Sequence, residues 1–233
     1  MITLRPSAER GYADHGWLRS FHSFSFAGYQ DPRHMGFGNL RVINEDRVAA
    51  GTGFGTHGHR DMEIVSVVLS GALSHQDSLG NGSVIRPGDV QRMSAGTGIR
   101  HSERNEAQGQ ETHFLQIWFL PDASGGDPGY EQRHFDGSDW QGRLMPLVSR
   151  DGREGSLSMR ADAVLSGGRF DGAQHLIKPM DPARLCYVHL IEGALMVNGH
   201  RLSAGDALLM QSQARLEISE GHQAQVLVFD LKA

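Results

Sequence analysis

The stretch Glu63-Ile64-Val65-Ser66-Val67-Val68-Leu69-Ser70-Gly71-Ala72-Leu73 decides the fold class, because an apolar run of strand length ends in a glycine turn and a second apolar run begins. Short apolar runs bounded by Gly, Pro, Asn and Asp are typical of β-strands. The same pattern extends to both sides, with apolar runs at 40–43, 83–85, 90–93 and 113–120. The sequence therefore predicts an all-β meander of antiparallel strands with few short helices.

Turn formers separate these runs. Asn44-Glu45-Asp46 and Pro87-Gly88-Asp89 are expected to be turns. Leu79-Gly80-Asn81-Gly82 is expected to form a hairpin, because Asn-Gly tolerates the positive φ angles of a tight turn.

The second half of the chain repeats the first. Gly71 followed by Gly88-Asp89 returns as Gly193 followed by Gly205-Asp206, each time between apolar runs. A repeat of this size predicts two barrels built alike, joined between residues 121 and 158, where Pro, Gly, Asp and Ser concentrate. We therefore expect an N-terminal domain at 1–135 and a C-terminal domain at 136–233.

Composition excludes several classes of protein. The 233 residues carry 22 Lys and Arg against 27 Asp and Glu, and no basic cluster, which argues against direct nucleic-acid binding. No apolar run approaches the roughly 18 residues of a membrane span, and residues 1–20 lack the apolar core of a signal peptide. We expect a cytoplasmic protein with no membrane partner, in which the single cysteine, Cys186, is a buried thiol.

Two polar signatures carry the chemistry, His57-Gly58-His59 and His101-Ser102-Glu103. Residues two apart on a strand share a face, so each signature points two potential ligands in one direction. If the two strands are neighbours in one barrel, three imidazoles and one carboxylate converge. That donor set predicts a mononuclear metal site with positions left for substrate or dioxygen.

Other polar residues compete for a place in this site. Glu63 and Asp61 share the parity of His57 and His59, so a straight strand would point them the same way. His75 and Asp77 form another same-face pair, which could orient the ligands, contact substrate or lie on the surface.

Sequence features around the second signature and in the second half sharpen this prediction. The glycine-rich loop Ser94–Arg100 precedes His101 and could let the backbone approach a ligand closely. In the aligned repeat, Pro179, Asp181 and Ile218 take the places of the three histidines, and Glu220 takes the place of Glu103. We therefore expect one metal site, in the N-terminal half.

A resemblance to a known family follows from these motifs. Gly51, His57-x-His59, Glu63 and Gly71 are spaced as in the first motif of the cupin superfamily, with one extra residue before Gly71. Further segments resemble the pirin family of cupins: Phe21–Phe26, His57–Glu63, His75–Asn81, Arg86–Gln91, Ser94–Glu103 and Gln116–Trp118. The resemblance implies two tandem cupin-like barrels (a bicupin) and the metal ligands His57, His59, His101 and Glu103.

The resemblance also implies a function. It is closest to bacterial pirin-like proteins with quercetin 2,3-dioxygenase activity, which implies an oxidoreductase that joins dioxygen to a small aromatic flavonol. The implied cofactor is one divalent transition metal ion, iron(II) in first place, with manganese, nickel, copper, cobalt or zinc as alternatives. Glu103, if it loosened from the metal, would take the proton of the substrate hydroxyl.

Two other functions remain open at this stage. The chain could be a metal-binding regulatory or protein-interaction pirin, with a protein partner and incidental oxygenase activity. It could also be a cupin isomerase or lyase that uses its metal only as a Lewis acid.

Overall fold

The computed structural model describes residues 1–233 and confirms an all-β fold. The only helices are three short 3₁₀ segments, η1 (Ser7–Glu9), η2 (Gly137–Trp140) and η3 (Arg153–Gly155), none of which has the length and apolar composition that a membrane crossing needs. The strands are β1 (Ile2–Arg5), β2 (Gly11–Asp14), β3 (Leu18–His22), β4 (Leu40–Val48), β5 (Gly53–His59), β6 (Glu63–Ser70), β7 (Leu73–Asp77), β8 (Gly82–Ile85), β9 (Asp89–Ser94), β10 (Ile99–Arg104), β11 (Thr112–Phe119), β12 (Gly129–His134), β13 (Leu144–Ser149), β14 (Leu157–Ser158), β15 (Ala163–Phe170), β16 (Leu176–Pro179), β17 (Leu185–Val197), β18 (His200–Ser203), β19 (Ala207–Gln211) and β20 (Arg215–Leu231).

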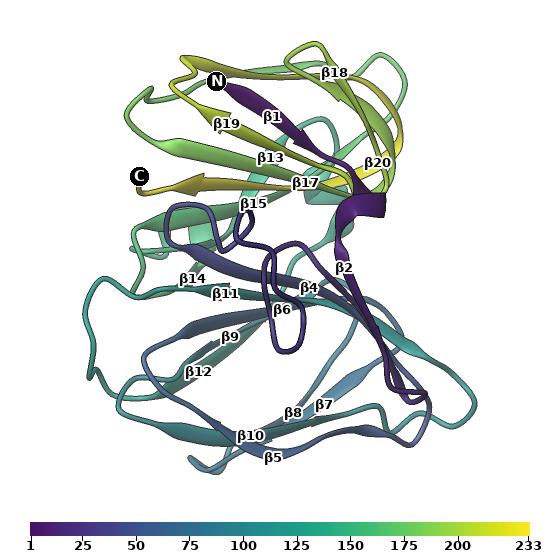
Figure 1. Ribbon diagram of the computed structural model, residues 1–233, viewed down its shortest axis with the longest axis vertical. Helices are drawn as coiled ribbons and strands as arrows, with labels where there is room; N and C mark the ends of the chain where they lie inside the picture. The colour runs from purple at the N-terminus through teal and green to yellow at the C-terminus, as the bar shows by residue number, and fades with distance from the viewer.

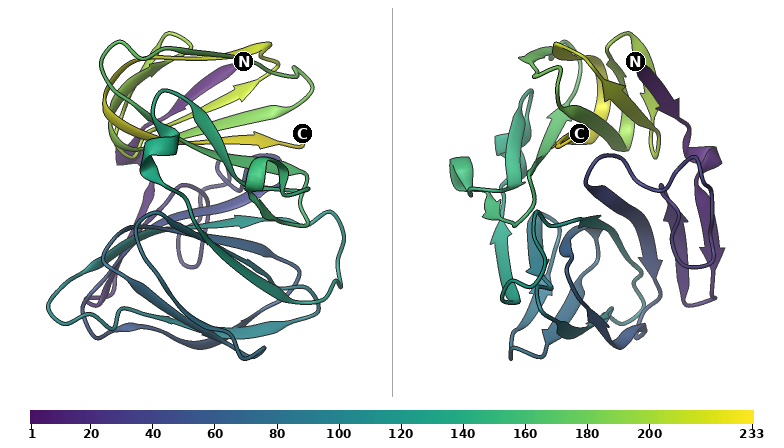
Figure 2. Two further views of the ribbon diagram at one scale, coloured as in Figure 1. Left: turned by 180° about the vertical axis from the view of Figure 1, so that it is seen from behind. Right: turned by 60° about the vertical axis from the view of Figure 1, so that its left-hand side comes forward.

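Two barrels lie one above the other (Figure 1). In the first barrel, a four-stranded sheet of order β5-β10-β7-β8 faces a seven-stranded sheet of order β12-β9-β6-β11-β4-β3-β2. The second barrel is formed by one nine-stranded sheet of order β1-β19-β17-β20-β15-β13-β14, with β16 paired to β20 and β18 paired to β17 beside this path. Figure 2 shows the two barrels from further sides, with the N-terminal segment running along both.

The largest hydrophobic core lies between the barrels. Its 24 buried residues come from both halves, among them Ile43 and Ile117 from the first and Leu227 and Phe229 from the second. Ile43 of β4 and Leu115 and Ile117 of β11 belong to this core, so the neighbouring positions 44, 46 and 116 face into the first barrel. Each fully buried side chain of this kind stabilises the fold by about 1.5–3 kcal/mol.

The interiors of the two barrels differ in polarity. A cluster of 14 buried apolar residues, including Ile218, Leu208 and Val226, lies among the strands of the second barrel. Cys186 belongs to this cluster, as expected for a buried thiol, and burial raises its pKa to about 12. Inward-facing positions of the first barrel instead hold buried polar groups, among them Ser66 and Gln116. Only the first barrel has an interior suited to binding a charged group.

The internal repeat is visible in the backbone. Gly71 and Gly193 have φ angles of 78° and 76°, and Gly88 and Gly205 have 93° and 84°. Both pairs of turns thus adopt the same left-handed conformation, which glycine reaches without a steric penalty.

Two sequence predictions need correction, and a third is left untested. The expected turn at 44–46 is wrong, because these residues lie inside β4, where Asn44 pairs in register with Gln116 and His22. The hairpin at 79–82 is present, but Gly80, with φ of 91°, takes the left-handed position that Asn-Gly was expected to fill. The domain division at residue 135 stays a prediction, and β1 departs from it by pairing with β19 of the second barrel.

Candidate metal centre

Three histidines converge inside the first barrel. In the antiparallel pairing of β5 with β10, His57 lies opposite His101, and His59 projects from the same face two residues on. The ring centroid of His101 lies 4.4 Å from that of His57 and 4.9 Å from that of His59. One ligand nitrogen from each of the three rings falls within 4.8 Å of the others. This spacing suits coordination of a single ion.

One hydrogen bond and two pKa values bear on how these rings could coordinate. Nδ1 of His57 lies 2.8 Å from the Gly55 carbonyl oxygen, to which it donates, so Nε2 is the nitrogen left to bind an ion. Burial lowers the pKa of His59 to about 4, and burial with the neighbouring imidazoles lowers that of His101 to about 3. Histidines must be neutral to bind a metal, so these two are ready to coordinate near neutral pH.

Glu103 lies beside His101 but is displaced from the other two histidines. The register of β10 against β5 shifts between His101 and Glu103, which sets Glu103 opposite Phe54. On the other side of β10, Glu103 lies opposite His75. Its carboxylate therefore belongs to a second group of potential ligands, with His75 and His101, again within 4.8 Å. Three of the four predicted ligands, the histidines, therefore form one group. Glu103 belongs to the second group, which shares His101 with the first.

Two neutral side chains hold the carboxylate of Glu103. The Gln116 amide donates to Oε2 at 2.7 Å, and the Ser66 hydroxyl donates to Oε1 at 3.4 Å. Trp118 Nε1 donates to Gln116 Oε1 at 3.2 Å, so the NH₂ group of the amide faces Glu103. Burial raises the pKa of Glu103 to about 7, because neither partner offsets the loss of water around a charge.

The donor set fits a divalent transition metal. Nε2 of His101 is buried and has no hydrogen-bond partner, which is costly unless another group satisfies it. Imidazole nitrogens and a carboxylate are ligands for iron, manganese, nickel, copper, cobalt and zinc. A bound cation would satisfy this nitrogen and compensate the buried carboxylate of Glu103.

His75 and Asp77 lie inside the barrel, not on its surface. His75 Nδ1 lies 3.5 Å from His101 Nδ1, and His75 Nε2 lies 3.3 Å from Asp77 Oδ2. The amides of Leu79 and Asn81 donate to Asp77 Oδ1. Of the three roles left open by the sequence, this geometry matches the orienting one, because the contacts from Asp77 through His75 fix the ring of His101.

Glu63 and Asp61 point elsewhere. The chain turns between β5 and β6, where Asp61 has a φ of 48°, so the assumption of a straight strand fails. Glu63 instead accepts a hydrogen bond from Ser94 at 2.7 Å, and Asp61 accepts one from the amide of Gly125 at 2.6 Å. Neither carboxylate is part of a group that could hold a metal.

The glycine-rich loop before β10 is packed against backbone. A Cβ atom at Gly96 would lie 2.0 Å from the Gly126 carbonyl oxygen, and the amide of Thr97 donates to that same oxygen. The close approach expected from the glycines is therefore made to a neighbouring loop, which fixes the start of β10.

Sequence reasoning missed the polar residues of the facing sheet. Gln116 lies in the middle of the apolar run of β11, and Asn44 and Asp46 alternate with Ile43 and Glu45 on β4. The available signal was a polar residue inside an otherwise apolar strand. Gln116, Asn44 and Asp46 each lie on the strand face opposite to the inter-barrel core.

Comparison with known proteins settles the family. The family model described as Pirin matches residues 3–119, and the one described as the quercetinase C-terminal cupin domain matches residues 146–231. The chain belongs to the pirin family. This pirin is 44% identical over 231 residues to the quercetin 2,3-dioxygenase of Escherichia coli strain K12, covering 99% of each chain. It is 39% identical over 231 residues to a pirin-like protein of Caulobacter vibrioides, again covering 99% of each.

A solved structure matches the whole of this pirin. The bacterial pirin YhhW of Escherichia coli, in complex with nickel(II), superposes with a TM-score of 0.95 at 43% identity, covering 100% of this chain and 99% of that one. The match confirms the two-barrel fold predicted from the internal repeat.

Proposed function

We propose that this pirin is a metal-dependent dioxygenase that cleaves a flavonol such as quercetin. The observation that carries the proposal is the convergence of His57, His59 and His101, with the buried Nε2 of His101 unpartnered. The relative named quercetin 2,3-dioxygenase, identical at 44% of positions along almost the whole chain, supports the reaction. The nickel(II) complex of a similar pirin supports a divalent ion at such a site.

The three histidines and Glu103 would hold the ion. Iron(II) remains the expected metal, with nickel, manganese, copper, cobalt or zinc as alternatives. When bound, such an ion would acidify a coordinated hydroxyl group and bring the flavonol and dioxygen together.

Residues of the chain would then handle the proton of the substrate. Oε2 of Glu103 is held by Gln116 at 2.7 Å, whereas Oε1 has only the longer contact of 3.4 Å with Ser66. Once Glu103 had loosened from the ion, Oε1 is therefore the oxygen that would accept the proton of the substrate hydroxyl. A pKa of about 7 suits a carboxyl group that must take up and release a proton near neutral pH. His75 and Asp77 would hold the ring of His101 in place meanwhile.

Anaerobic addition of quercetin to the metal-loaded protein tests this function. We expect the absorbance of the bound flavonol to shift to that of the flavonolate and to bleach when air is admitted. The reaction should consume dioxygen, which separates it from an isomerase or lyase. Binding without turnover for every redox-active metal tried would refute the oxygenase and leave a binding or regulatory protein.

The metal assignment has its own test, in which His59→Ala is compared with His15→Ala. His59 lies in the cluster, whereas His15 is an exposed histidine outside it. We expect His59→Ala to lose most of its bound metal in elemental analysis while the circular dichroism spectrum stays that of the folded barrel. Full retention of metal by His59→Ala would contradict the ligand assignment.

A further inference from the structure

A cavity of about 360 Å³ opens beside the metal centre. Aromatic side chains line much of it, including Phe26, Tyr29 and Phe54, and its volume falls in the range of small-molecule sites. Two of its lining residues lie beside candidate metal ligands. Gln116 lines the cavity and donates to Glu103, and the ring of Phe54 lies 6.5 Å from that of His57.

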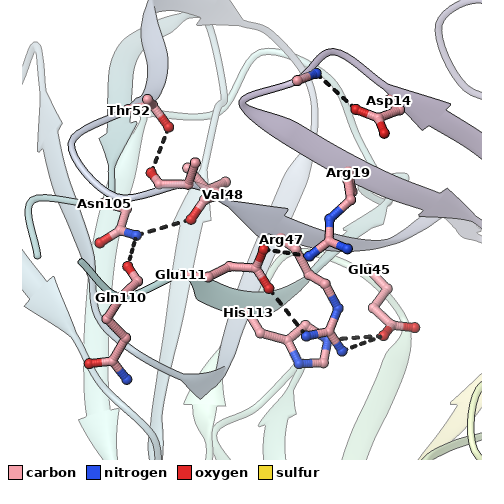
Figure 3. A network of polar contacts seen from close by, with 12 residues as sticks. Asp14, Arg19, Glu45, Arg47, Val48, Thr52, Asn105, Gln110, Glu111 and His113 are labelled. Atoms are coloured by element: carbon pink, nitrogen blue, oxygen red, sulfur yellow. Dashed lines mark hydrogen bonds and ion pairs between the residues drawn. The ribbon is translucent and has the colours of Figure 1, made fainter. Parts of the chain in front are cut away.

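One carboxyl group lies in the wall of this cavity. Asp46 on β4 is 3% exposed, and it lies in register between Ser20 of β3 and Phe114 of β11. Figure 3 shows the opposite face of β4, where Glu45 and Arg47 form ion pairs with His113 and Glu111 on the side away from the barrel interior. Because side chains alternate along a strand, Asp46 points the other way, into the barrel.

The polar groups around Asp46 are already paired with one another. The Asn44 side-chain oxygen lies 2.9 Å from His22 Nδ1, and the Gln116 amide is occupied by Glu103 and Trp118. Oδ1 of Asp46, in contrast, is buried and has no hydrogen-bond partner. Buried acceptors are rarely left unsatisfied, so an unpaired carboxyl oxygen in the wall of a cavity indicates a donor supplied by the occupant.

The electrostatic surroundings of Asp46 are consistent with this role. Burial, opposed by the Ser20 hydroxyl and aided by the nearby charge of Glu45, raises its pKa to about 7. The titratable groups that line the same cavity with Asp46 are Tyr12, His15, His22 and Tyr29, and Glu103 contacts the lining residue Gln116. No lysine or arginine is among the residues that line this cavity.

We propose that Asp46 accepts a hydrogen bond from a hydroxyl group of the molecule that fills this cavity. The chemical class of the ligand is then a planar aromatic compound that carries a hydroxyl group on the ring lying beside β4. Phe26, Tyr29 and Phe54 supply the apolar contacts to its rings, and Asp46 selects the hydroxylated compound over its deoxy analogue. The proposal rests on the proposed function for the identity of the ligand, and it assigns a specificity-determining residue outside the metal ligands.

A double-mutant cycle on binding tests the proposal. Anaerobic dissociation constants are measured at pH 8.5, above the pKa of about 7 of Asp46, for quercetin and for flavonols that each lack one hydroxyl group. The proteins compared are the wild type, Asp46→Leu and Glu106→Leu. Because leucine cannot accept a hydrogen bond, we expect Asp46→Leu to weaken quercetin binding about 10- to 100-fold, as for loss of a hydrogen bond to a charged group. One deoxy flavonol should bind the wild type at least about tenfold more weakly than quercetin, and Asp46→Leu should abolish that difference.

Glu106→Leu is the control, since it removes a carboxylate in the same way at an exposed position outside the cavity. Its affinities should equal those of the wild type. If Asp46→Leu does not fold, Asp46→Ala takes its place with the same expectations. Unchanged affinities in the Asp46 variant, or loss of its metal, would overturn the proposal.

The outcomes also separate this proposal from the proposed function. Discrimination by Asp46 without cleavage in air would refute the dioxygenase and support the hydroxyl contact. Failure of the wild type to bind any flavonol would overturn both.

Discussion

The candidate ligands differ in protonation state before an ion binds. Burial lowers the pKa of His59 to about 4 and that of His101 to about 3, so both rings are neutral at pH 6. Burial has the opposite effect on Glu103, whose pKa rises to about 7, because loss of water disfavours the charged form of each group. At pH 6 in the metal-free site, His59 and His101 are thus neutral and able to coordinate, whereas the carboxyl group of Glu103 is protonated.

Metal binding should therefore release a proton from Glu103. Below pH 7 the metal-free carboxyl group is protonated and must ionise to coordinate, so the apparent affinity should fall as the pH falls from 7 to 5.5. We expect about one proton released per ion at pH 6 and close to none at pH 8.5, measured by calorimetry in buffers of different ionisation enthalpy. Glu103→Gln should abolish the release at pH 6, and the same release in that variant would exclude Glu103 as its source.

Gln116 should affect metal affinity without touching the ion. Its amide fixes Oε2 of Glu103, and Trp118 fixes the amide. We expect Gln116→Leu to weaken metal binding about 10- to 100-fold in a competition assay with a chelator, as is usual for partners of metal ligands. Gln76→Leu, an exposed position on β7, is the control and should bind as tightly as the wild type. Equal affinities for both variants would show that Glu103 does not need this support.

At the scale of elements, strand β10 and the loop before it set the geometry of the site. His101 and Glu103 could be placed on one face from their spacing alone, but the register shift between them could not, because it arises from pairing with β5. The loop is fixed by Gly96, whose φ is 49° and whose Cα lies against the Gly126 carbonyl. Contacts between segments distant in sequence, invisible in the local pattern, decide where Glu103 points.

Gly96→Ala should destabilise the protein. A left-handed alanine costs about 1–2 kcal/mol, and the added Cβ meets the Gly126 carbonyl oxygen at 2.0 Å. We expect Tm to fall by at least about 2–4 °C, the shift that about 1 kcal/mol produces in a chain of this size. Gly82→Ala is the control, since a Cβ there would meet nothing within 4 Å. Equal Tm values for the two variants would contradict the role of Gly96.

At the scale of the whole molecule, the two barrels are joined by a shared core and by the N-terminal segment. β1 pairs with β19 of the second barrel along four residues, and β2 and β3 then join the seven-stranded sheet of the first. The segment thus crosses from one barrel to the other, as Figure 2 shows. Both groups of potential metal ligands lie in the first barrel, and the nine-stranded sheet of the second covers the apolar face of the first.

Removal of residues 1–6 should destabilise the second barrel. The deletion takes away β1 and the buried side chain of Arg5, and it exposes the edge of β19. We expect a Tm several degrees lower than that of the full chain. Relative to the full chain, hydrogen exchange should accelerate more in β19 than in β11. Deletion of Ala233, an exposed residue at the other end of the chain, is the control. Unchanged exchange in β19 would show that β1 does not contribute to the second barrel.

The sequence by itself determined the all-β class, the two-fold repeat and the face on which His57, His59 and His101 lie. Those features depend on local alternation and on turn residues, which neighbours in the sequence specify. Only the tertiary structure decided that 44–46 continue a strand, that Glu63 turns away, and that Glu103 meets Gln116. These outcomes depend on pairing and packing between distant segments, where the burial of a face overrides the local preference of a residue for a turn.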